Sequence, residues 1–492
     1  MKSSRLRVLI AATEIFPMAK TGGLADATAA LGAALADLNI DVHFVMPGYP
    51  HVLEQQRKID FQTTLPEIAG HAGGILLSTL TPDSKLPLHL VDLPSVYQNG
   101  GGLYVGPDGE ERPDNALRFA VLSHVITQLA LGELGHAPFD LVHCNDWHTG
   151  LTPLMLQNRA PGQAPATVFT IHNMAFQGQC SEEQWAQLEV ALSAEQWPRI
   201  EYYGSASFLK AGLEFADQLT TVSPRYAEEI QTSEFGFGLE GVLQSRRDRL
   251  TGILNGIDTS LWSPESSPWV PRHYSAEDLS AKAFCKQQLQ QQLELEPSPT
   301  SPLMAFIGRL TWQKMADVLL ESIPEYLERE PDRQFVLVGN GDRHLEAAYL
   351  ALAAEHPGRV AVQIDYTEVL AHRTHAGADI LIHGSRFEPC GLTQLYAMRF
   401  GTIPVVRPVG GLADSVVDAT PDNLATGDAT GFYFEQPDSA DMLAGIDRAI
   451  ALYRQPDAWH RLQQTAMQQD FSWDSSARAY LQVYDKACAR GS

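Results

Sequence analysis

A strand–loop–helix pattern runs through the first half of the chain, stops, and begins again in the second half. A largely apolar run at 7–12 is followed by a loop, an Ala/Leu-rich helix at 24–38 and a second apolar run at 41–48. The same order returns with an apolar run at 303–308 and a helix at 316–327. Alternating strands and helices predict a parallel sheet with ligands at the carboxyl ends of its strands. We therefore expect an α/β protein with two doubly wound domains and an active site in the cleft between them.

The length of the chain agrees with this division. At 492 residues it exceeds what one hydrophobic core normally holds. The first pattern closes at Asp258, and the residues that follow are rich in Ser, Pro and Gln. We expect an N-terminal domain at 1–258, a linker at 259–301 and a second domain at 302–472.

The chain is strongly acidic, with a formal net charge of −24. This charge argues against nucleic acids and anionic membranes as partners. A substrate that carries phosphate would need a local cluster of cations to bind. Nothing in the composition indicates an oligomeric state.

The cysteines and the N-terminus bear on the compartment. None of the five cysteines forms a CxxC pair, which argues against a disulfide framework or a zinc site. The basic residues at 1–7 look like the start of a signal peptide, but the apolar run after them is too short. No run approaches the ~18 apolar residues of a membrane span. We expect a cytoplasmic protein.

The segment Ile382-His383-Gly384-Ser385-Arg386-Phe387-Glu388-Pro389-Cys390-Gly391-Leu392-Thr393-Gln394 has the features of a ligand-binding strand end. An apolar strand leads into a short polar loop, and a helix is expected to begin at Gly391 or Thr393. A helix N-terminus favours anions, and Glu388 is suited to holding sugar hydroxyls. The pattern is typical of a sugar-nucleotide pocket, with an ordinary turn as the alternative.

Two loops carry cations suited to phosphate. Arg309 and Lys314 share the loop after the strand at 303–308. An arginine holds a pyrophosphate as a fork, and a lysine acts on it as a point charge. Lys20 stands beside Gly22-Gly23, where the backbone can approach a ligand closely. The alternatives are a solvated basic loop and a plain helix entry.

Histidines also follow the predicted strands of the first half, at His143, His148 and His172. Their spacing is not that of a known His/Cys metal site, and no DxD carboxylate pair occurs in the sequence. We therefore expect chemistry at the strand ends without a metal.

Several of these motifs, in order along the chain, resemble those of bacterial glycogen synthases and plant starch synthases. The matching segments are Lys20-Thr21-Gly22-Gly23-Leu24-Ala25-Asp26, Asn145-Asp146-Trp147-His148, His172-Asn173, Asn255-Gly256-Ile257-Asp258, Arg309 with Lys314, and Ser385 to Gln394. The resemblance spans essentially the whole chain. It implies a GT-B fold, in which two Rossmann-like domains face each other across a deep cleft. It also implies that a C-terminal helix, within 473–492, crosses back onto the first domain.

The resemblance implies an activity as well. Glucose would pass from ADP-glucose to the non-reducing 4-hydroxyl of an α-1,4-glucan, either glycogen or a maltooligosaccharide, with retention of configuration. ADP-glucose would be a co-substrate, with no cofactor and no metal. Without a metal, the negative charge on the departing ADP needs fixed cations and helix N–H groups.

Roles follow for the matching residues. Arg309 and Lys314 would stabilise the leaving pyrophosphate, which Lys20 would also meet. Glu388 would bind glucose hydroxyls near the reacting carbon, and His172 would share charge there. The other implied substrate contacts are Gly22, Gly23, Gly391, Leu392 and Thr393 at the phosphates, Asp26, Tyr104 and Asn255 in the glucose pocket, Asp146 near the acceptor and Tyr366 near the adenine.

Three positions depart from the family pattern. Met315 and Asp365 stand where Gly is usual, and His383-Gly384 replaces a Pro-containing sequence. All three border the expected donor site. The alternatives are therefore a transferase that uses UDP-glucose or another acceptor, and a catalytically impaired glucan-binding protein. The retention of Lys20, Arg309 and Glu388 favours an active enzyme.

Overall fold

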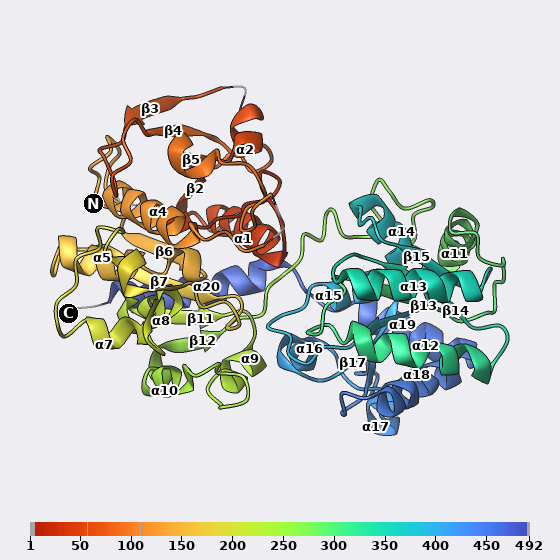
Figure 1. Ribbon diagram of the computed structural model, residues 1–492. Helices are drawn as coiled ribbons and strands as arrows, with labels where there is room; N and C mark the ends of the chain where they lie inside the picture. Colours follow the sequence, from red (N-terminus) through yellow and green to blue (C-terminus); the bar gives the residue numbers. More distant parts are fainter. Residues whose placement is uncertain (1–4, 57, 108–109, 490–492) are drawn as a thin grey trace. The chain divides into compact units, whose positions relative to one another are not determined.

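The computed structural model describes residues 5–56, 58–107 and 110–489, which form two compact units. Unit 1 holds the described residues up to Gly256 together with those from Trp473 onward, and unit 2 is Ile257–Ser472. Each unit is built on a sheet of mostly parallel strands covered by helices (Figure 1). The prediction of two doubly wound α/β domains is confirmed.

Unit 1 is built on a nine-stranded sheet in the order β12-β11-β7-β6-β1-β2-β5-β4-β3. The strands from β12 to β5 run parallel, whereas β4 is antiparallel to both β5 and β3. Val8 of β1 pairs with Val42 of β2 on one side and Leu141 of β6 on the other. The strands are β1 (Arg7–Ala11), β2 (Asp41–Pro47), β3 (Phe61–Thr64), β4 (Ile75–Leu80), β5 (Pro87–Asp92), β6 (Leu141–Asn145), β7 (Ala166–Ile171), β11 (Gln218–Thr221) and β12 (Leu250–Gly252).

Helices and a small three-stranded sheet complete unit 1. The helices are α1 (Gly23–Asp37), α2 (Pro50–Glu54), α3 (Pro94–Tyr97), α4 (Asn115–Ala130), α5 (Thr152–Arg159), α6 (Glu182–Trp185), α7 (Trp197–Ile200), α8 (Phe208–Phe215), α9 (Pro224–Glu229), α10 (Glu240–Ser245), α20 (Trp473–Cys488) and the short 3₁₀ helices η1 (Trp147–Thr149) and η2 (Arg247–Arg249). The small sheet is β8 (Gln179–Cys180), β9 (Glu201–Tyr202) and β10 (Ser205–Ser207).

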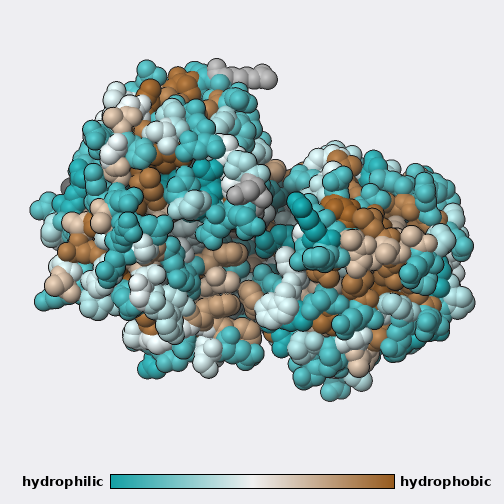
Figure 2. Space-filling model, in the orientation of Figure 1, coloured by the Kyte–Doolittle hydropathy of each residue, from teal (hydrophilic) through white to brown (hydrophobic). Residues whose placement is uncertain are grey.

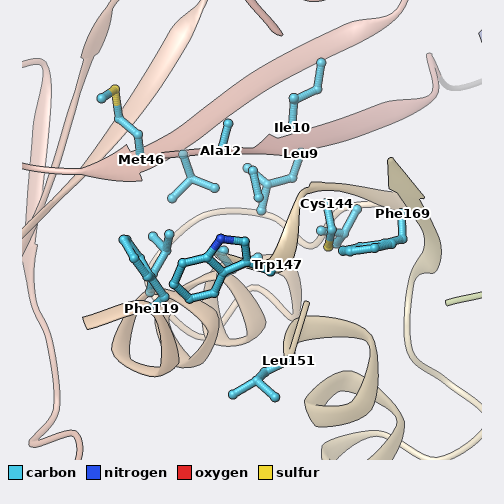
Figure 3. Close-up of a cluster of buried hydrophobic side chains, with 14 of the residues drawn as sticks. Leu9, Ile10, Ala12, Met46, Phe119, Cys144, Trp147, Leu151 and Phe169 are labelled. Carbon is cyan, nitrogen blue, oxygen red and sulfur yellow. The ribbon is translucent and has the colours of Figure 1, made fainter. Parts of the chain in front are cut away.

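The core of unit 1 lies between the central strands and the helices that cover them. Strands β6 and β7 are buried along their whole length, as is typical of strands covered on both faces. Figure 3 shows the part of this core beneath β1, where Trp147 lies close to Phe119. Their ring centroids are 5.0 Å apart in an edge-to-face arrangement. This packing fixes η1 and with it the segment that follows β6.

The C-terminal helix α20 belongs to unit 1, where the resemblance placed it. Its Tyr484 hydroxyl is 2.8 Å from His143 Nδ1, and its Ser476 hydroxyl donates to the carbonyl of Leu254 at 2.6 Å. His143 is therefore a buried structural residue that contacts a helix and lies outside the candidate chemistry.

Unit 2 holds a six-stranded sheet in the order β15-β14-β13-β16-β17-β18, and all its strands are parallel. The strands are β13 (Leu303–Ile307), β14 (Gln334–Val338), β15 (Val360–Gln363), β16 (Ile380–His383), β17 (Ile403–Val406) and β18 (Phe432–Tyr433). The helices are α11 (Ser280–Gln292), α12 (Ala316–Arg329), α13 (Arg343–Glu355), α14 (Glu368–Gly377), α15 (Thr393–Arg399), α16 (Gly410–Ser415), α17 (Pro421–Thr426), α18 (Ser439–Tyr453) and α19 (Pro456–Met467).

The prediction of a linker at 259–301 is wrong. This segment belongs to unit 2 and contains α11. Trp262 is 5% exposed and stacks on Tyr396 with centroids 3.7 Å apart. Cys285 and Leu289 of α11 are also buried in the unit's core. The Ser, Pro and Gln residues that suggested a linker stand between apolar anchors, which hold the segment on the unit.

The surface view shows hydrophilic residues over much of the visible face of each unit, with groups of hydrophobic residues among them (Figure 2). In the described part of the chain, no helix is both long and apolar enough to cross a membrane.

Three histidines, the buried His89 and the half-buried His43 and His136, form a cluster near the amino ends of the parallel strands of unit 1. His43 Nδ1 lies 3.1 Å from His89 Nε2, and His89 Nδ1 lies 2.8 Å from the Ser78 hydroxyl. His136 Nε2 is 3.3 Å from the same hydroxyl. Burial lowers the pKa of His43 from 6.5 to about 4, although the nearby carboxylate of Asp41 opposes this shift.

We expect His43 to make the stability of the protein depend on pH. Below pH 6.5 the unfolded chain protonates this histidine, whereas the folded protein does so only near pH 4. The free energy of unfolding should therefore fall as the pH drops through this window, by about 2 kcal/mol at pH 5 for this group. Urea unfolding at pH 7 and pH 5 should show a smaller loss for His43→Gln than for the parent protein. The exposed His460→Gln serves as control, and an equal loss in all three proteins would contradict the assignment.

Candidate functional site

The loop after β16 holds Glu388 in a buried ion pair with Lys314. Glu388 is 5% exposed, and its Oε2 accepts a hydrogen bond from the Lys314 ammonium. The Ser385 hydroxyl donates to the same oxygen at 2.8 Å, and His383 Nε2 lies 3.2 Å from it. His383 Nε2 also lies 3.3 Å from Lys314 Nζ. The structure thus joins two predicted site residues and adds two more partners.

The two oxygens of the Glu388 carboxylate differ in their hydrogen bonds. Its side-chain contacts all fall on Oε2, and Oε1 makes no hydrogen bond with any residue within the described ranges. The Glu388 carbonyl accepts the N–H of Gly411 at 3.0 Å, which fixes the backbone as well. Glu388 is therefore held at one oxygen, and the other is left for a ligand.

The charges in this cluster follow from its partners. Burial alone would raise the pKa of Glu388, but the charge of Lys314 and the contact with His383 outweigh burial and hold the pKa well below its usual range. Burial and then the charge of Lys314 lower the pKa of His383, although Glu388 opposes them. At neutral pH the cluster is an ammonium, a carboxylate and a neutral imidazole.

Arg309 lies at the start of the loop that carries Lys314, and its side chain is exposed. Its guanidinium makes no ion pair and no hydrogen bond with another residue of the described chain. An arginine in this state is ready to bind an anionic ligand without first leaving a protein partner.

Met315 follows Lys314 in a conformation that favours glycine. Its φ is +52°, and its side chain is fully buried in the core of unit 2. A Cβ added to Gly384 would lie 3.4 Å from the Met315 Cβ, so these two departures from the family pattern are neighbours. Backbone strain of about 1 kcal/mol is offset by burial of the methionine side chain.

The helix start at 391–393 forms as predicted, with Leu392 preceding α15 at Thr393. Gly391 has a φ of +71°, and a Cβ there would lie 2.5 Å from the Gln394 side-chain oxygen. The Gln394 amide donates to the carbonyls of Cys390 at 3.1 Å and Gly391 at 2.8 Å. Gln394 therefore holds the turn between Glu388 and the helix.

In unit 1, Asp146 follows β6 in a strained conformation. Its φ of +56° and ψ of 177° lie in a region that is normally restricted to glycine. Asp146 Oδ1 accepts the backbone N–H of His172 at 2.8 Å. Burial raises the pKa of Asp146 to about 7, against the backbone N–H groups of His172 and Asn173, and the charge of Glu14 adds to the rise.

His172 follows β7 and is uncharged at neutral pH, because burial lowers its pKa to about 4. Its Nε2 lies 2.9 Å from Asn145 Oδ1. The Asn145 amide nitrogen donates to the carbonyl of Ala11, which assigns Oδ1 as the acceptor. Nε2 therefore carries the proton, and Nδ1 can accept a hydrogen bond from a hydroxyl.

Glu14, which follows β1, links the Lys20 loop to Tyr104. Its Oε1 accepts from the Thr21 hydroxyl at 2.6 Å and from the Tyr104 hydroxyl at 2.5 Å. Its Oε2 accepts the N–H of Thr21 and, at 3.2 Å, that of Gly22. The Gly22 N–H, which the resemblance assigns to a phosphate, thus already has a partner in this structure.

The remaining predicted residues lie as follows. Lys20 Nζ is 3.0 Å from Asp26 Oδ1. Asp26 lies in the first turn of α1, which begins at Gly23. Asn255 is buried in the segment after β12. Tyr366 lies between β15 and α14 with a side chain 42% exposed, and Asp365 beside it is exposed as well.

A cavity of about 260 Å³ in unit 1 is lined in part by Trp147, the residue after Asp146. The rest of its lining comes from the loop before α4, the start of α4 and the β8–α6 region, and includes the polar side chains of Arg112, Asn115, Gln179 and Gln184. Among the residues that the structure describes, no three His, Cys, Asp or Glu side chains come together as metal ligands would.

Comparisons with known proteins match both units. Residues 7–245 fit the family model described as the starch synthase catalytic domain, and residues 288–467 fit glycosyl transferases group 1. A glycogen synthase from Burkholderia thailandensis is 51% identical over 97% of this chain and 90% of its own. A glycogen synthase from Thioalkalivibrio sulfidiphilus is 46% identical over 97% of this chain and 99% of its own. The chain belongs to the glycogen synthase family.

Solved structures agree with this family. The catalytic domain of starch synthase IV from Arabidopsis thaliana, bound to ADP and acarbose, superposes with a TM-score of 0.87 at 31% identity, over 99% of this chain and 100% of that one. Sucrose-phosphate synthase from Thermosynechococcus elongatus shares the fold. It superposes with a TM-score of 0.61 at 18% identity, over 98% of this chain and 99% of that one. The GT-B fold expected for a glycogen synthase is thereby confirmed.

Sequence reasoning missed the residues that support the site. Glu14 was not predicted to take part in the site, and His383 was noted only as a departure from the family pattern. A carboxylate directly after a buried strand was the available signal for Glu14. Ser385 and Gln394 lay within a recognised motif, but their roles depend on contacts that the sequence does not reveal.

We expect Lys314→Met to destabilise the protein. The substitution leaves the buried carboxylate of Glu388 without its ammonium partner, which should lower the free energy of unfolding by about 3 kcal/mol. The double variant Lys314→Met/Glu388→Gln removes both charges and should recover part of the loss. Urea unfolding of the full chain measures both effects, and a double variant less stable than Lys314→Met would contradict a buried ion pair.

Proposed function

We propose that this protein is an active glycogen synthase that transfers glucose from ADP-glucose to the non-reducing 4-hydroxyl of an α-1,4-glucan, with retention of configuration. The observation that carries the proposal is the Lys314–Glu388 pair, which leaves Glu388 Oε1 available to a ligand, while the exposed Arg309 lies in the same loop as Lys314. This arrangement suits a sugar next to a pyrophosphate. Family membership supports the reaction class.

The leaving group determines the roles of the cations. ADP departs with added negative charge, and fixed cations stabilise that charge without reorganising. We assign Arg309 and Lys314 to the pyrophosphate, together with the N–H groups at Gly391, Leu392 and Thr393. Lys20 and Gly23 of unit 1 would supply further donors. The reaction then requires no metal or other cofactor.

The sugar is assigned to the neutral and acidic groups. Glu388 Oε1 would accept a glucose hydroxyl, because Oε2 is already engaged. His172 Nδ1 would accept another, and the low pKa of this histidine supports a role as a neutral hydrogen-bonding group near the reacting centre. Asp26, Tyr104 and Asn255 would complete the glucose pocket.

The acceptor would attack the anomeric carbon on the face from which ADP leaves. A bond forms between the acceptor 4-oxygen and that carbon as the carbon–phosphate-oxygen bond breaks. The acceptor proton passes to the departing phosphate oxygen, so no separate general base is required, and attack on that face retains the configuration without an enzyme nucleophile. Asp146 would lie near the acceptor glucose, and the cavity lined by Arg112, Asn115, Gln179 and Gln184 would offer hydrogen-bonding side chains to its hydroxyls.

The donor is assigned to ADP-glucose, with Tyr366 near the adenine. The related starch synthase IV was solved with ADP and acarbose, which supports a nucleotide-sugar donor and a glucan acceptor. Met315 and Gly384 fit each other, which supports an intact donor site despite these departures. We place the protein in the cytoplasm, where its sugar-nucleotide donor would be found.

Nucleotide release tests the proposal. The purified protein with glycogen should release ADP from ADP-glucose without added metal, and the rate should exceed the release of UDP from UDP-glucose by at least tenfold. Glycogen-dependent UDP release alone would reassign the donor. Release of neither nucleotide by a folded protein that still binds glycogen would contradict an active enzyme.

Arg309→Ala is the matched variant for this assay. The Arg309 side chain is exposed and has no partner to lose among the described residues, so its removal should leave the unfolding midpoint unchanged. The kcat should fall by at least 100-fold if the guanidinium stabilises the leaving group in the transition state. A change confined to KM would make Arg309 a ground-state binding residue only.

A further inference from the structure

A buried carboxylate that the proposed reaction does not use lies at the centre of the unit 1 site. Glu14 is 2% exposed, and its two oxygens accept four hydrogen bonds. A buried carboxylate is costly unless it is paired or fully hydrogen-bonded. Here the partners are neutral donors, and all of them come from two segments that the proposed function assigns to substrate.

The first segment is the loop that carries Lys20 and leads into α1. Gly22 precedes this helix without a side-chain cap. Glu14 binds both the hydroxyl and the N–H of Thr21, and also the N–H of Gly22. The negative charge also lies close to a helix N-terminus, where it is favourable. Loss of the carboxylate would leave these N–H groups without an acceptor.

The second segment carries Tyr104. Its hydroxyl bonds to Glu14 at 2.5 Å and lies 2.7 Å from the Thr13 hydroxyl. Its ring stacks on His148 with centroids 4.7 Å apart. Tyr104 thus connects the Glu14 carboxylate to the segment that follows β6, which includes Asp146. The charge of Glu14 also contributes to the raised pKa of Asp146.

We propose that Glu14 is a positioning residue for glucose transfer, whose carboxylate locks the Lys20 loop and Tyr104 into a single arrangement. This inference rests on the proposed function, which assigns both segments to the substrates. It also changes the expected contacts of the loop. Because Glu14 holds the N–H groups of Thr21 and Gly22, a phosphate at this loop would meet Lys20 and the Gly23 N–H.

The test compares two isosteric substitutions in the full-length protein. Glu14→Gln keeps the shape of the side chain but replaces one carboxylate oxygen with an NH₂ group, which cannot accept the hydrogen bonds that the backbone N–H groups donate. Asp217→Asn is the matched control: Asp217 is also buried in unit 1, and its carboxylate accepts the N–H of Thr167 at 2.8 Å and the hydroxyl of the same residue at 2.6 Å. Both variants should lose stability, whereas only Glu14→Gln should lower kcat, by at least tenfold.

A double-mutant cycle with Tyr104→Phe separates positioning from general damage. Tyr104→Phe removes one hydrogen bond to Glu14 and retains the ring. If Glu14 acts through Tyr104, the loss in kcat for the double variant should be smaller than the product of the two single losses. A kcat for Glu14→Gln within twofold of the parent, or fully multiplicative losses, would overturn the proposal.

Amide hydrogen exchange gives a readout that does not depend on turnover. In Glu14→Gln, exchange should accelerate at residues 15–24 and around Tyr104 together, and Asp217→Asn should leave both segments unchanged. Acceleration of neither segment, or of only one, would overturn the positioning role. If the parent protein does not use ADP-glucose, the proposed function fails, while the exchange result still decides whether Glu14 joins the two segments.

Discussion

In each unit the candidate site depends on a carboxylate buried near the carboxyl ends of parallel strands. A buried charge is stable only when directed partners surround it, and those partners then lose their freedom to move. In unit 2, Glu388 is held by Lys314, Ser385 and His383 at one oxygen. In unit 1, Glu14 is held by donors from the Lys20 loop and Tyr104. Side chains assigned to the substrates are therefore ordered before any substrate binds.

Burial also determines which side chains near the strand ends are charged at neutral pH, and the resulting charges suit the proposed chemistry. Histidines near the strand ends are neutral, because burial lowers the pKa of both His172 and His383. The cations are then arginine and lysine side chains, of which Arg309 is exposed and ready for an anion. Asp146, whose pKa burial raises to about 7, has less negative charge at neutral pH than an exposed carboxylate. With neutral histidines and fixed cations, the charge that develops in the proposed reaction would lie on the departing diphosphate and not on a histidine.

The fold could be predicted from the sequence because buried parallel strands leave long apolar runs that alternate with helices. The Glu388 loop and its helix start were predictable for the same reason, since they lie within one strand–loop–helix unit. The linker prediction failed because Trp262 and α11 are anchored by contacts far along the chain, as with Tyr396. The role of Glu14 could not be predicted, because its hydrogen bond with Tyr104 joins residues 90 positions apart and forms only in the folded unit.

A crystal structure of the protein with ADP and a maltooligosaccharide tests the roles of Glu388, Lys314 and Arg309 most directly. We expect the ADP phosphates against Arg309 and Lys314, and a sugar hydroxyl on Glu388 Oε1 while Oε2 keeps its three side-chain partners. Phosphates bound away from both cations, or a sugar that displaces Lys314 from Oε2, would contradict these roles.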